Sequence, residues 1–196
     1  MKELKDFLPE KNNVRVTKGS LLLAEPFMGD ENFERSVVLI CEHSNTTGSF
    51  GLVLTQTMEL LLDDVIEDDI YPDVPLYVGG PVEKNTLHYI HRRPDLIENS
   101  TKLQEGLYWS GNFQQIKKLL NLGTLPVQDI RFFIGYSGWS GGQLQTELER
   151  DSWIVSSTAS EVLLDIPIEQ LWRTTLRNMG GAYRVLSHYP TDPRHN

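Results

Sequence analysis

Residues 138–142 read Gly-Trp-Ser-Gly-Gly and match the Gly-x-Ser-x-Gly pattern of serine hydrolases. In that motif a sharp turn between a strand and a helix exposes the serine hydroxyl beside backbone N–H groups. Ser140 would be the nucleophile, and Asp165 and His188 follow it in the order that this fold uses. The alternative is a glycine-rich turn in which Ser140 caps a helix and pairs with Gln143 in a capping box. We favour the turn, because such hydrolases need a larger parallel sheet than this chain indicates.

The same segment could bind an anion, because glycines allow backbone N–H groups to converge at the start of a helix. A nucleotide loop is not predicted, since Ser137 stands where Gly-x-Gly-x-x-Gly needs its second glycine and no Gly-Lys-Ser/Thr occurs. A phosphate or carboxylate ligand is therefore favoured over a nucleotide. Gly79, Gly80 and Pro81 form a second turn of this kind. These glycines either allow the positive φ that the end of a strand needs or let the backbone approach a ligand closely. We favour the first interpretation.

The remaining reactive side chains show no spacing typical of a metal centre. Cys41 and His43 share one face of an expected strand, but neighbours on that face lie about 6.5–7 Å apart, too far for a direct hydrogen bond. One cysteine cannot build a thiolate zinc site, and the five histidines lack His-x-x-x-His spacing. We predict no metal and no cofactor. Trp139 either covers a pocket or packs over the glycines.

Basic residues give no nucleic-acid signature. Arg173, Arg177 and Arg184 fall in or near the last helical segment, where arginines near the carboxyl end of a helix are favourable. The formal net charge is −9, whereas affinity for DNA depends on cationic contacts with phosphates. With no helix-turn-helix pairing or basic stripe, nucleic-acid binding is not predicted.

Hydrophobic patterning indicates the elements that must position these residues. Short apolar runs predict strands at 19–24, 36–43, 51–55, 74–78, 86–91, 107–110, 130–136 and 153–155. Apolar side chains at helical spacing predict helices after Asn112, around 144–148 and from Pro167 to the glycine pair 180–181. Residues 135–142 are expected to form a glycine-rich turn, and Thr158-x-x-Glu161 resembles a capping box.

Hairpins come first and strand–helix alternation follows. This order favours an α+β fold with a mixed, largely antiparallel sheet, open or barrel-like, and helices packed on it. The 196 residues are expected to form one domain, 1–196, with a helical arm at 1–13 and a loose tail at 190–196. A single cysteine excludes an intramolecular disulfide and fits a reducing compartment. Since no apolar run has the length of a membrane span or a secretory signal, we expect a cytoplasmic protein without a membrane partner.

Several short patterns follow one another between residues 19 and 154. They are Gly19-Ser-Leu-Leu-Leu-Ala24 with Pro26, Asp30-Glu-Asn-Phe33-Glu-Arg35-Ser36, Glu42-His43, Gly48-Ser-Phe-Gly51-Leu-Val-Leu54, Gly79-Gly80-Pro81-Val82, Gly135-Tyr136-x-Gly138-Trp139, Gln143-Leu144-x-x-Glu147 and Trp153. Together they resemble the YqgE/AlgH family of small bacterial proteins. Thr55 departs from the family pattern, which usually has Asn there, although both side chains can bond backbone at a turn.

The resemblance implies a compact α+β fold on a mixed sheet and no particular reaction, because the family has no established enzymatic activity. Some members carry the label of transcriptional regulator. We favour a non-enzymatic binding or regulatory module, with a serine hydrolase and a transcriptional regulator as alternatives. Its partner would be another protein or a small anionic ligand. The candidate site residues are Gly79, Gly80, Pro81, Gly138, Trp139 and Gln143, with polar support from Asp30, Arg35 and His43.

Overall fold

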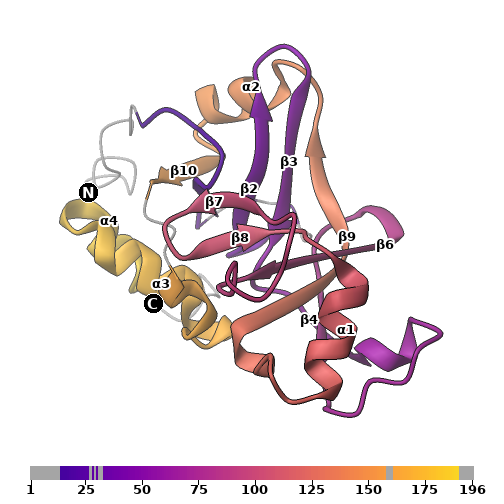
Figure 1. Ribbon diagram of the computed structural model, residues 1–196. Coiled ribbons are helices and arrows are strands. Elements are labelled where there is room, and N and C mark those ends of the chain that lie inside the picture. The colour runs from indigo at the N-terminus through magenta and orange to yellow at the C-terminus, as the bar shows by residue number, and fades with distance from the viewer. Residues whose placement is uncertain (1–13, 27, 29, 31–32, 158–160, 190–196) are drawn as a thin grey trace, which may run out of the picture.

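The computed structural model describes residues 14–26, 28, 30, 33–157 and 161–189. The arm expected at 1–13, the tail at 190–196 and the capping box that begins at Thr158 lie outside the described residues. The described chain forms a ten-stranded sheet with helices packed against it, which confirms the α+β class (Figure 1). Of the helices described, none is both long and apolar enough to cross a membrane.

The elements have the following bounds. The strands are β1 Leu21–Ala24, β2 Val37–Ser44, β3 Gly48–Val53, β4 Thr57–Leu61, β5 Pro75–Val78, β6 Val82–His91, β7 Thr101–Gln104, β8 Leu107–Trp109, β9 Ile130–Trp139 and β10 Trp153–Ser156. The helices are α1 Phe113–Asn121, α2 Gln143–Glu149, α3 Ile168–Met179 and α4 Gly181–Leu186, with short 3-10 turns η2 Leu62–Asp64, η3 Val127–Asp129 and η4 Glu161–Leu164.

The sheet is built around β9. Its order is β10-β1-β2-β3-β9-β6-β8-β7, all antiparallel, while β5 pairs with β9 in parallel and β4 pairs with β5. The last part of β9 pairs with β3, and its first part lies between β5 and β6. The sheet is therefore mixed and largely antiparallel, as expected, and it does not close into a barrel.

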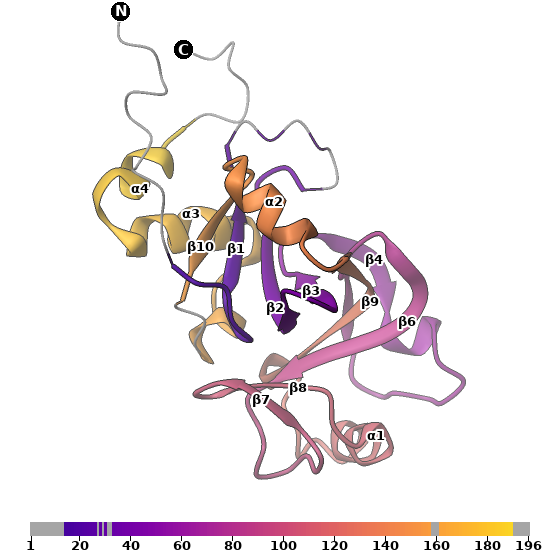
Figure 2. The ribbon, with the colours of Figure 1, turned by 90° about the horizontal axis from the view of Figure 1, so that it is seen from above.

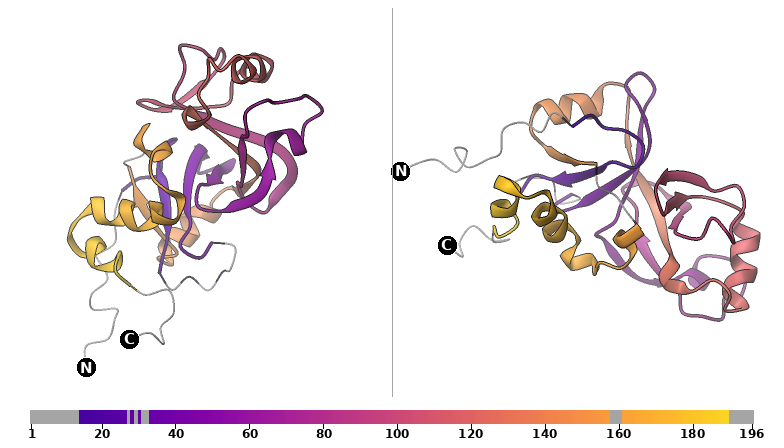
Figure 3. Two further views of the ribbon diagram at one scale, coloured as in Figure 1. Left: turned by 90° about the horizontal axis from the view of Figure 1, so that it is seen from below. Right: turned by 60° about the vertical axis from the view of Figure 1, so that its left-hand side comes forward.

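Alternate side chains of the sheet feed three buried apolar clusters. Phe133 belongs to the first, which the helices α3 and α4 complete, and Phe132 belongs to the second, which α1 covers. Trp139 belongs to the third, beneath α2. Figure 3 shows α2 and the α3–α4 pair on opposite faces of β1 and β2, and Figure 2 shows α1 beyond β7 and β8. Neighbouring residues of one strand point to opposite faces, which separates Phe132 from Phe133, and the far end of β9, where it pairs with β3, brings Trp139 into the third cluster.

The helices follow local signals. Asn112 caps α1, as predicted, because its side-chain oxygen accepts a hydrogen bond of 3.2 Å from the backbone N–H of Gln115. In α3, Leu171, Trp172 and Leu176 are buried at helical spacing. The Trp172 indole donates to the carbonyl of Ala24 at 2.9 Å, which ties α3 to the first strand of the sheet.

Three local expectations need correction. The expected glycine-rich turn at 135–142 is mostly strand, because β9 runs on to Trp139 and only residues 140–142 turn. The edge strands β4 and β7 were not predicted, since residues 57–61 are largely exposed and Leu103 is the only buried residue of β7. The glycine pair at 180–181 ends α3 after Met179, as predicted, but the further helix α4, which begins at Gly181, was not predicted.

Candidate functional site

The two glycine segments that the sequence singles out meet in space. The N–H of Gly79 donates to the carbonyl of Ile134 on β9 at 2.8 Å, and its own carbonyl accepts from Val53 on β3 at 2.8 Å. A Cβ on Gly80, whose φ is +152°, would lie 2.3 Å from the backbone of Tyr136. The segment 79–81 therefore crosses β9 at a distance that only glycine allows.

Beside this crossing lies a cavity of about 290 Å³, here called the indole cavity. It is lined by Met28, Asp30, Phe33, Pro81, Val82, Ser137, Gly138, Trp139, Gln143, Glu147, Ser152 and Trp153. Five of the nine sequence-derived binding candidates thus share one cavity, namely Asp30, Pro81, Gly138, Trp139 and Gln143. Its walls come from the β1–β2 loop, the start of β6, the end of β9, helix α2 and the start of β10.

The carboxylate of Glu147 is the structural centre of the indole cavity. One of its oxygens accepts hydrogen bonds from the indole N–H groups of both Trp139 and Trp153, each at 2.8 Å. The other oxygen accepts the side-chain amide of Gln143 at 3.0 Å. Since Gln143 and Glu147 are four residues apart, they lie on one face of α2. A single acidic residue therefore fixes both tryptophans.

Aromatic rings form much of the cavity wall. Trp139 and Trp153 meet edge to face with ring centroids 6.0 Å apart, and Phe33 meets Trp153 in the same way at 5.4 Å. Trp139 is only 6% exposed, so it packs within the wall and does not cover the opening from a mobile turn. Met28 adds an apolar, adaptable side chain at the loop side.

The glycine pattern suggests an anion site, but the charge of the cavity lining is negative. Its charged lining side chains are Asp30 and Glu147, both carboxylates. The backbone N–H of Ser140, an expected anion donor, instead donates to the side-chain oxygen of Gln143 at 3.0 Å. This bond is half of the predicted capping box, although the residue that precedes α2 is Gly142. An anion here would face negative charge.

His43 and Arg35 do not line the indole cavity. The Nδ1 atom of His43 is 2.8 Å from the hydroxyl oxygen of Ser49 within the β2–β3 hairpin. The thiol of Cys41 is fully buried, and its hydrogen bond goes to the carbonyl of Leu39 and not to His43. Burial raises the pKa of the Cys41 thiol well above its usual value. Arg35 lies in a second cavity, described below.

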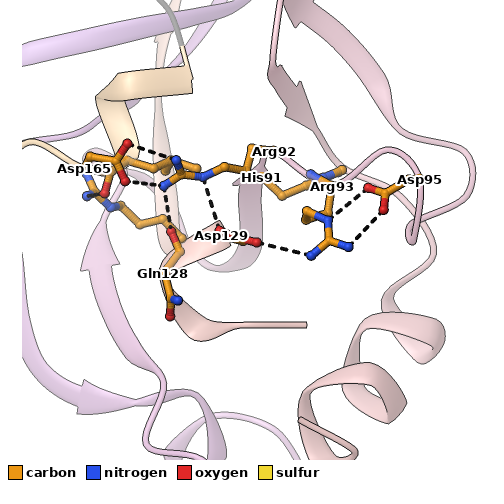
Figure 4. Close-up of polar contacts among 9 residues, drawn as sticks. His91, Arg92, Arg93, Asp95, Gln128, Asp129 and Asp165 are labelled. Atoms are coloured by element: carbon orange, nitrogen blue, oxygen red, sulfur yellow. Dashed lines mark hydrogen bonds and ion pairs between the residues drawn. The ribbon is translucent and has the colours of Figure 1, made fainter. Parts of the chain in front are cut away.

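The residues of the hydrolase alternative are not brought together. Asp165 is paired with Arg92 through two hydrogen bonds of 2.9 and 2.6 Å (Figure 4), and this guanidinium lowers the pKa of the carboxyl. His188 bonds the carbonyl of Arg184, and the Ser140 hydroxyl bonds Gln143. Arg92 lies beside the residue that begins β9, whereas Ser140 follows its last residue; ten extended residues span about 30 Å.

The network in Figure 4 joins the end of β6 to η3 and η4. Asp129 is 3.3 Å from the guanidinium groups of both Arg92 and Arg93, and Arg93 also holds Asp95. His91, fully buried, accepts the backbone N–H of Arg93 at Nδ1 and donates from Nε2 to the carbonyl of Ser110. One ring nitrogen accepts and the other donates, as in a neutral imidazole, and burial lowers the pKa of His91. These contacts support the fold.

Sequence reasoning missed several of the cavity's residues. Glu147 stands within a recognised pattern, yet no role was predicted for it. Its spacing of four from Gln143 and its nearness along the chain to Trp139 and Trp153 were the available signals. Phe33 and Val82 stand in the quoted patterns and Ser152 does not, but no role was predicted for any of them, since only the folded chain brings their segments together.

Comparisons with known proteins agree with the fold and the patterns. The AlgH-like family model matches residues 21–184. A UPF0301 protein of Cytophaga hutchinsonii is 43% identical over 182 residues, which cover 92% of this chain and 100% of the relative. A UPF0301 protein of Bacteroides thetaiotaomicron is 37% identical over 97% of this chain and 96% of its own length.

Two solved structures are also similar. A crystal structure of a Corynebacterium diphtheriae protein superposes with a TM-score of 0.73 at 26% identity, covering 92% of this chain and 95% of the other. The solution structure of the AlgH protein from Pseudomonas aeruginosa gives a TM-score of 0.70 at 27% identity, covering 92% and 98%. The chain therefore belongs to the YqgE/AlgH family.

Proposed function

We propose that this protein is a non-enzymatic binding module and that its indole cavity receives an apolar or cationic group. The observation that carries this proposal is the convergence of five segments on one aromatic cavity whose charged lining groups, among the residues that the structure describes, are both carboxylates. The volume of about 290 Å³ lies at the small end of ligand pockets. It suits a single side chain of a partner protein or a small amine.

The hydrogen bonding of the cavity favours binding over catalysis. Both oxygens of Glu147 are occupied by donors from the protein, so this carboxylate holds the wall in place and is not poised to take a proton from a substrate. The Ser140 hydroxyl is engaged by Gln143, and no histidine of the described residues hydrogen-bonds to it. A preformed wall with satisfied polar groups lowers the cost of ordering the site when a ligand binds.

The chemistry of the wall sets the class of ligand. Indole faces attract cations through their quadrupole and bury apolar carbon equally well. Asp30 and Glu147 add negative charge near the opening and the wall. A carboxylate or phosphate would be repelled by both groups, so we replace the small anionic ligand expected at this turn with a cation or an uncharged apolar group.

The proposal does not include DNA regulation. The net charge of −9 is unfavourable for binding to phosphates, and the arginines of α3 share that helix with Glu169. We place the function in the cytoplasm, where a lone buried thiol such as Cys41 remains reduced.

Three matched probes test the ligand class: the N-acetyl methylamides of lysine, norleucine and glutamate. Each is titrated into the protein while the unfolding midpoint and the indole emission are recorded. We expect the lysine and norleucine probes to raise the midpoint and change the emission, because Trp139 and Trp153 line the cavity. We expect no response to the glutamate probe.

Two tryptophan variants show where the probes bind. Trp139→Phe keeps an aromatic ring but removes the indole bond to Glu147, so binding of the lysine and norleucine probes should weaken severalfold. Trp109→Phe is the control, since Trp109 lies on β8 outside the cavity lining. Equal weakening in the two folded variants, or a glutamate probe that binds as well as lysine, would disprove the proposal.

A further inference from the structure

A second cavity, here called the arginine cavity, lies between the β1–β2 loop and the first turns of α3. Its volume is about 190 Å³, and its lining includes Glu34, Arg35, Thr55, Glu169, Trp172 and Arg173. It is separate from the indole cavity, because none of its lining residues is shared. Phe33 faces the indole cavity, whereas its chain neighbours Glu34 and Arg35 face the arginine cavity.

The conformation of Arg35 in the arginine cavity is strained and leaves one of its donors without a partner. Its φ is +50°, in the left-handed region where a side chain other than glycine is strained. Its guanidinium lies over the ring of Trp172 with 5.0 Å between the central carbon and the ring centroid, and one Nη donates to the carbonyl of Tyr189 at 2.7 Å. The Nε atom is buried and has no hydrogen-bond partner. The Arg35 side chain is thus fixed in place while its Nε–H donor has no acceptor.

Arg173 brings a second positive charge to the arginine cavity. Within the described part of the chain its guanidinium forms no hydrogen bond or ion pair, and neither Glu34 nor Glu169 pairs with Arg35 or Arg173. Burial lowers the pKa of Arg35, and the charge of Arg173 lowers it further, while Glu34 opposes this effect. The two arginines therefore repel each other, and neither lining glutamate forms an ion pair with either of them.

Thr55 adds a neutral donor to the same cavity. Its hydroxyl oxygen accepts the backbone N–H of Val37 at 3.2 Å, which leaves the hydroxyl hydrogen available to a further acceptor. The lining of the arginine cavity thus includes Arg35, whose buried Nε–H has no partner, together with Arg173 and Thr55. These three side chains are hydrogen-bond donors, and two of them are cationic. The carboxylates of Glu34 and Glu169 also line the cavity, but neither forms an ion pair with the two arginines, whereas the indole cavity has no cationic side chain in its described lining.

We propose that the arginine cavity binds the oxyanion of a small molecule, a phosphate or a carboxylate group, between Arg35 and Arg173. Such an anion satisfies the unused Nε–H, relieves the repulsion between the two guanidinium groups and accepts charge-assisted hydrogen bonds from both. This anion site differs from the one expected at the glycine-rich turn, and the indole cavity keeps its different ligand.

The test uses inorganic phosphate and succinate, each titrated into the full chain at an ionic strength held constant with sodium chloride. The unfolding midpoint and the Nε–H signals of the arginines in NMR spectra report binding, and the preferred titrant tells which oxyanion is bound. We expect at least one of them to bind and to shift the Nε–H signal of Arg35.

Variants on α3 separate a site from general charge attraction. Arg173→Gln removes one positive charge from the cavity, and binding should weaken by about tenfold or more. Arg177→Gln is the matched control, because it removes the same charge one turn later on the same helix and outside the lining. Its effect should stay below about twofold, as expected for a screened surface charge.

Arg35→Lys gives a second, independent variant, since it keeps the charge and loses the Nε donor. In a variant that is folded by circular dichroism, binding should again weaken by about tenfold. The inference is overturned if neither anion binds the wild type, or if Arg173→Gln and Arg177→Gln weaken binding equally. The lysine and norleucine probes of the indole cavity should bind all three arginine variants unchanged, so the two proposals can fail separately.

Discussion

Glu147 shows how much of the indole cavity depends on one residue. It is half-buried on α2, and its carboxylate receives three N–H donors from three other side chains. Hydrogen bonds to an ionised acceptor are stronger than those to a neutral one, and each holds a ring or an amide in a fixed orientation. The residue binds no ligand in our proposal, yet it positions the rings that do.

We predict that Glu147→Gln destabilises the protein by about 2 kcal/mol, because an amide group turns one of the two acceptor positions into a donor that faces N–H groups. Urea unfolding measures the effect. Glu149→Gln on the same helix is the control, since Glu149 is exposed and accepts a hydrogen bond from Gln145 at 3.1 Å. Its cost should stay within about 0.5 kcal/mol. Equal costs for both variants would show that the indole bonds are not a major contribution.

Single residues were predicted from sequence where their role is local. Asn112 caps α1 because its side chain needs only the following turn. The roles of Glu147 and Arg35 depend on partners from distant segments, such as the carbonyl of Tyr189, which is 154 residues from Arg35. No local sequence pattern encodes such a contact, so only some of the residues that line the cavities could be predicted.

Among the elements, the crossing of residues 79–81 over β9 sets the position of both the sheet and the indole cavity. The N–H of Gly79 bonds β9 and its carbonyl bonds β3, so this short segment joins two neighbouring strands. Gly80 then passes the backbone of Tyr136 without room for a Cβ. Pro81 and Val82 follow at once and reach the cavity wall.

We predict that Gly80→Ala costs about 3 kcal/mol or more of unfolding free energy, because the new Cβ collides with backbone that cannot move without breaking sheet hydrogen bonds. Gly142→Ala is the matched control. Gly142 has a φ of +78° and no atom within 4 Å of an added Cβ, so only backbone strain of about 1 kcal/mol is expected. Urea unfolding measures the loss of unfolding free energy in both variants. Equal losses would show that the collision at Gly80 does not occur.

The same crossing explains why the length of β9 was predicted wrongly. Glycines at 135 and 138 indicate a turn when they are read along the chain alone. In the fold, a Cβ on Gly135 would meet the carbonyl of Gly80 at 2.7 Å, so this glycine permits two backbones to approach within a sheet. The elements that were correctly predicted, such as β2 and α3, carry an uninterrupted apolar pattern.

For the whole molecule, β9 is the strand on which the three apolar clusters depend. Phe132 and Phe133 are fully buried on its two faces, and Trp139 lies in the third cluster. Residues 132–134 are bonded to β5 on one side and β6 on the other. Opening β9 would therefore expose apolar surface in every cluster at once, whereas β4 and β7 lie at edges.

We predict that the backbone amides of residues 132–134 exchange with deuterium only through global unfolding, and that those of β4 exchange through local opening at a lower free energy. Native-state hydrogen exchange with increasing denaturant distinguishes the two. Exchange of residues 132–134 that is as fast as exchange in β4 would show that β9 is not the common support.

The α+β class was predictable because it depends on the order of strands and helices, which periodicity reports. The pairing of β5 with β9 in parallel was not, since strand partners follow from three-dimensional packing and not from local pattern. For the same reason the meeting of the two glycine segments was a hypothesis in the sequence and became an observation only in the fold.

The reaction rate of the buried Cys41 thiol can measure how fast the sheet opens. Cys41 is the chain's only cysteine, it lies in β2 between β1 and β3, and its raised pKa suppresses the reactive thiolate. A colorimetric thiol reagent in large excess therefore reacts at the rate at which this part of the sheet opens. Ligands of either cavity that stabilise the closed sheet would slow the colour change, and neither a label nor an engineered cysteine is needed to observe it.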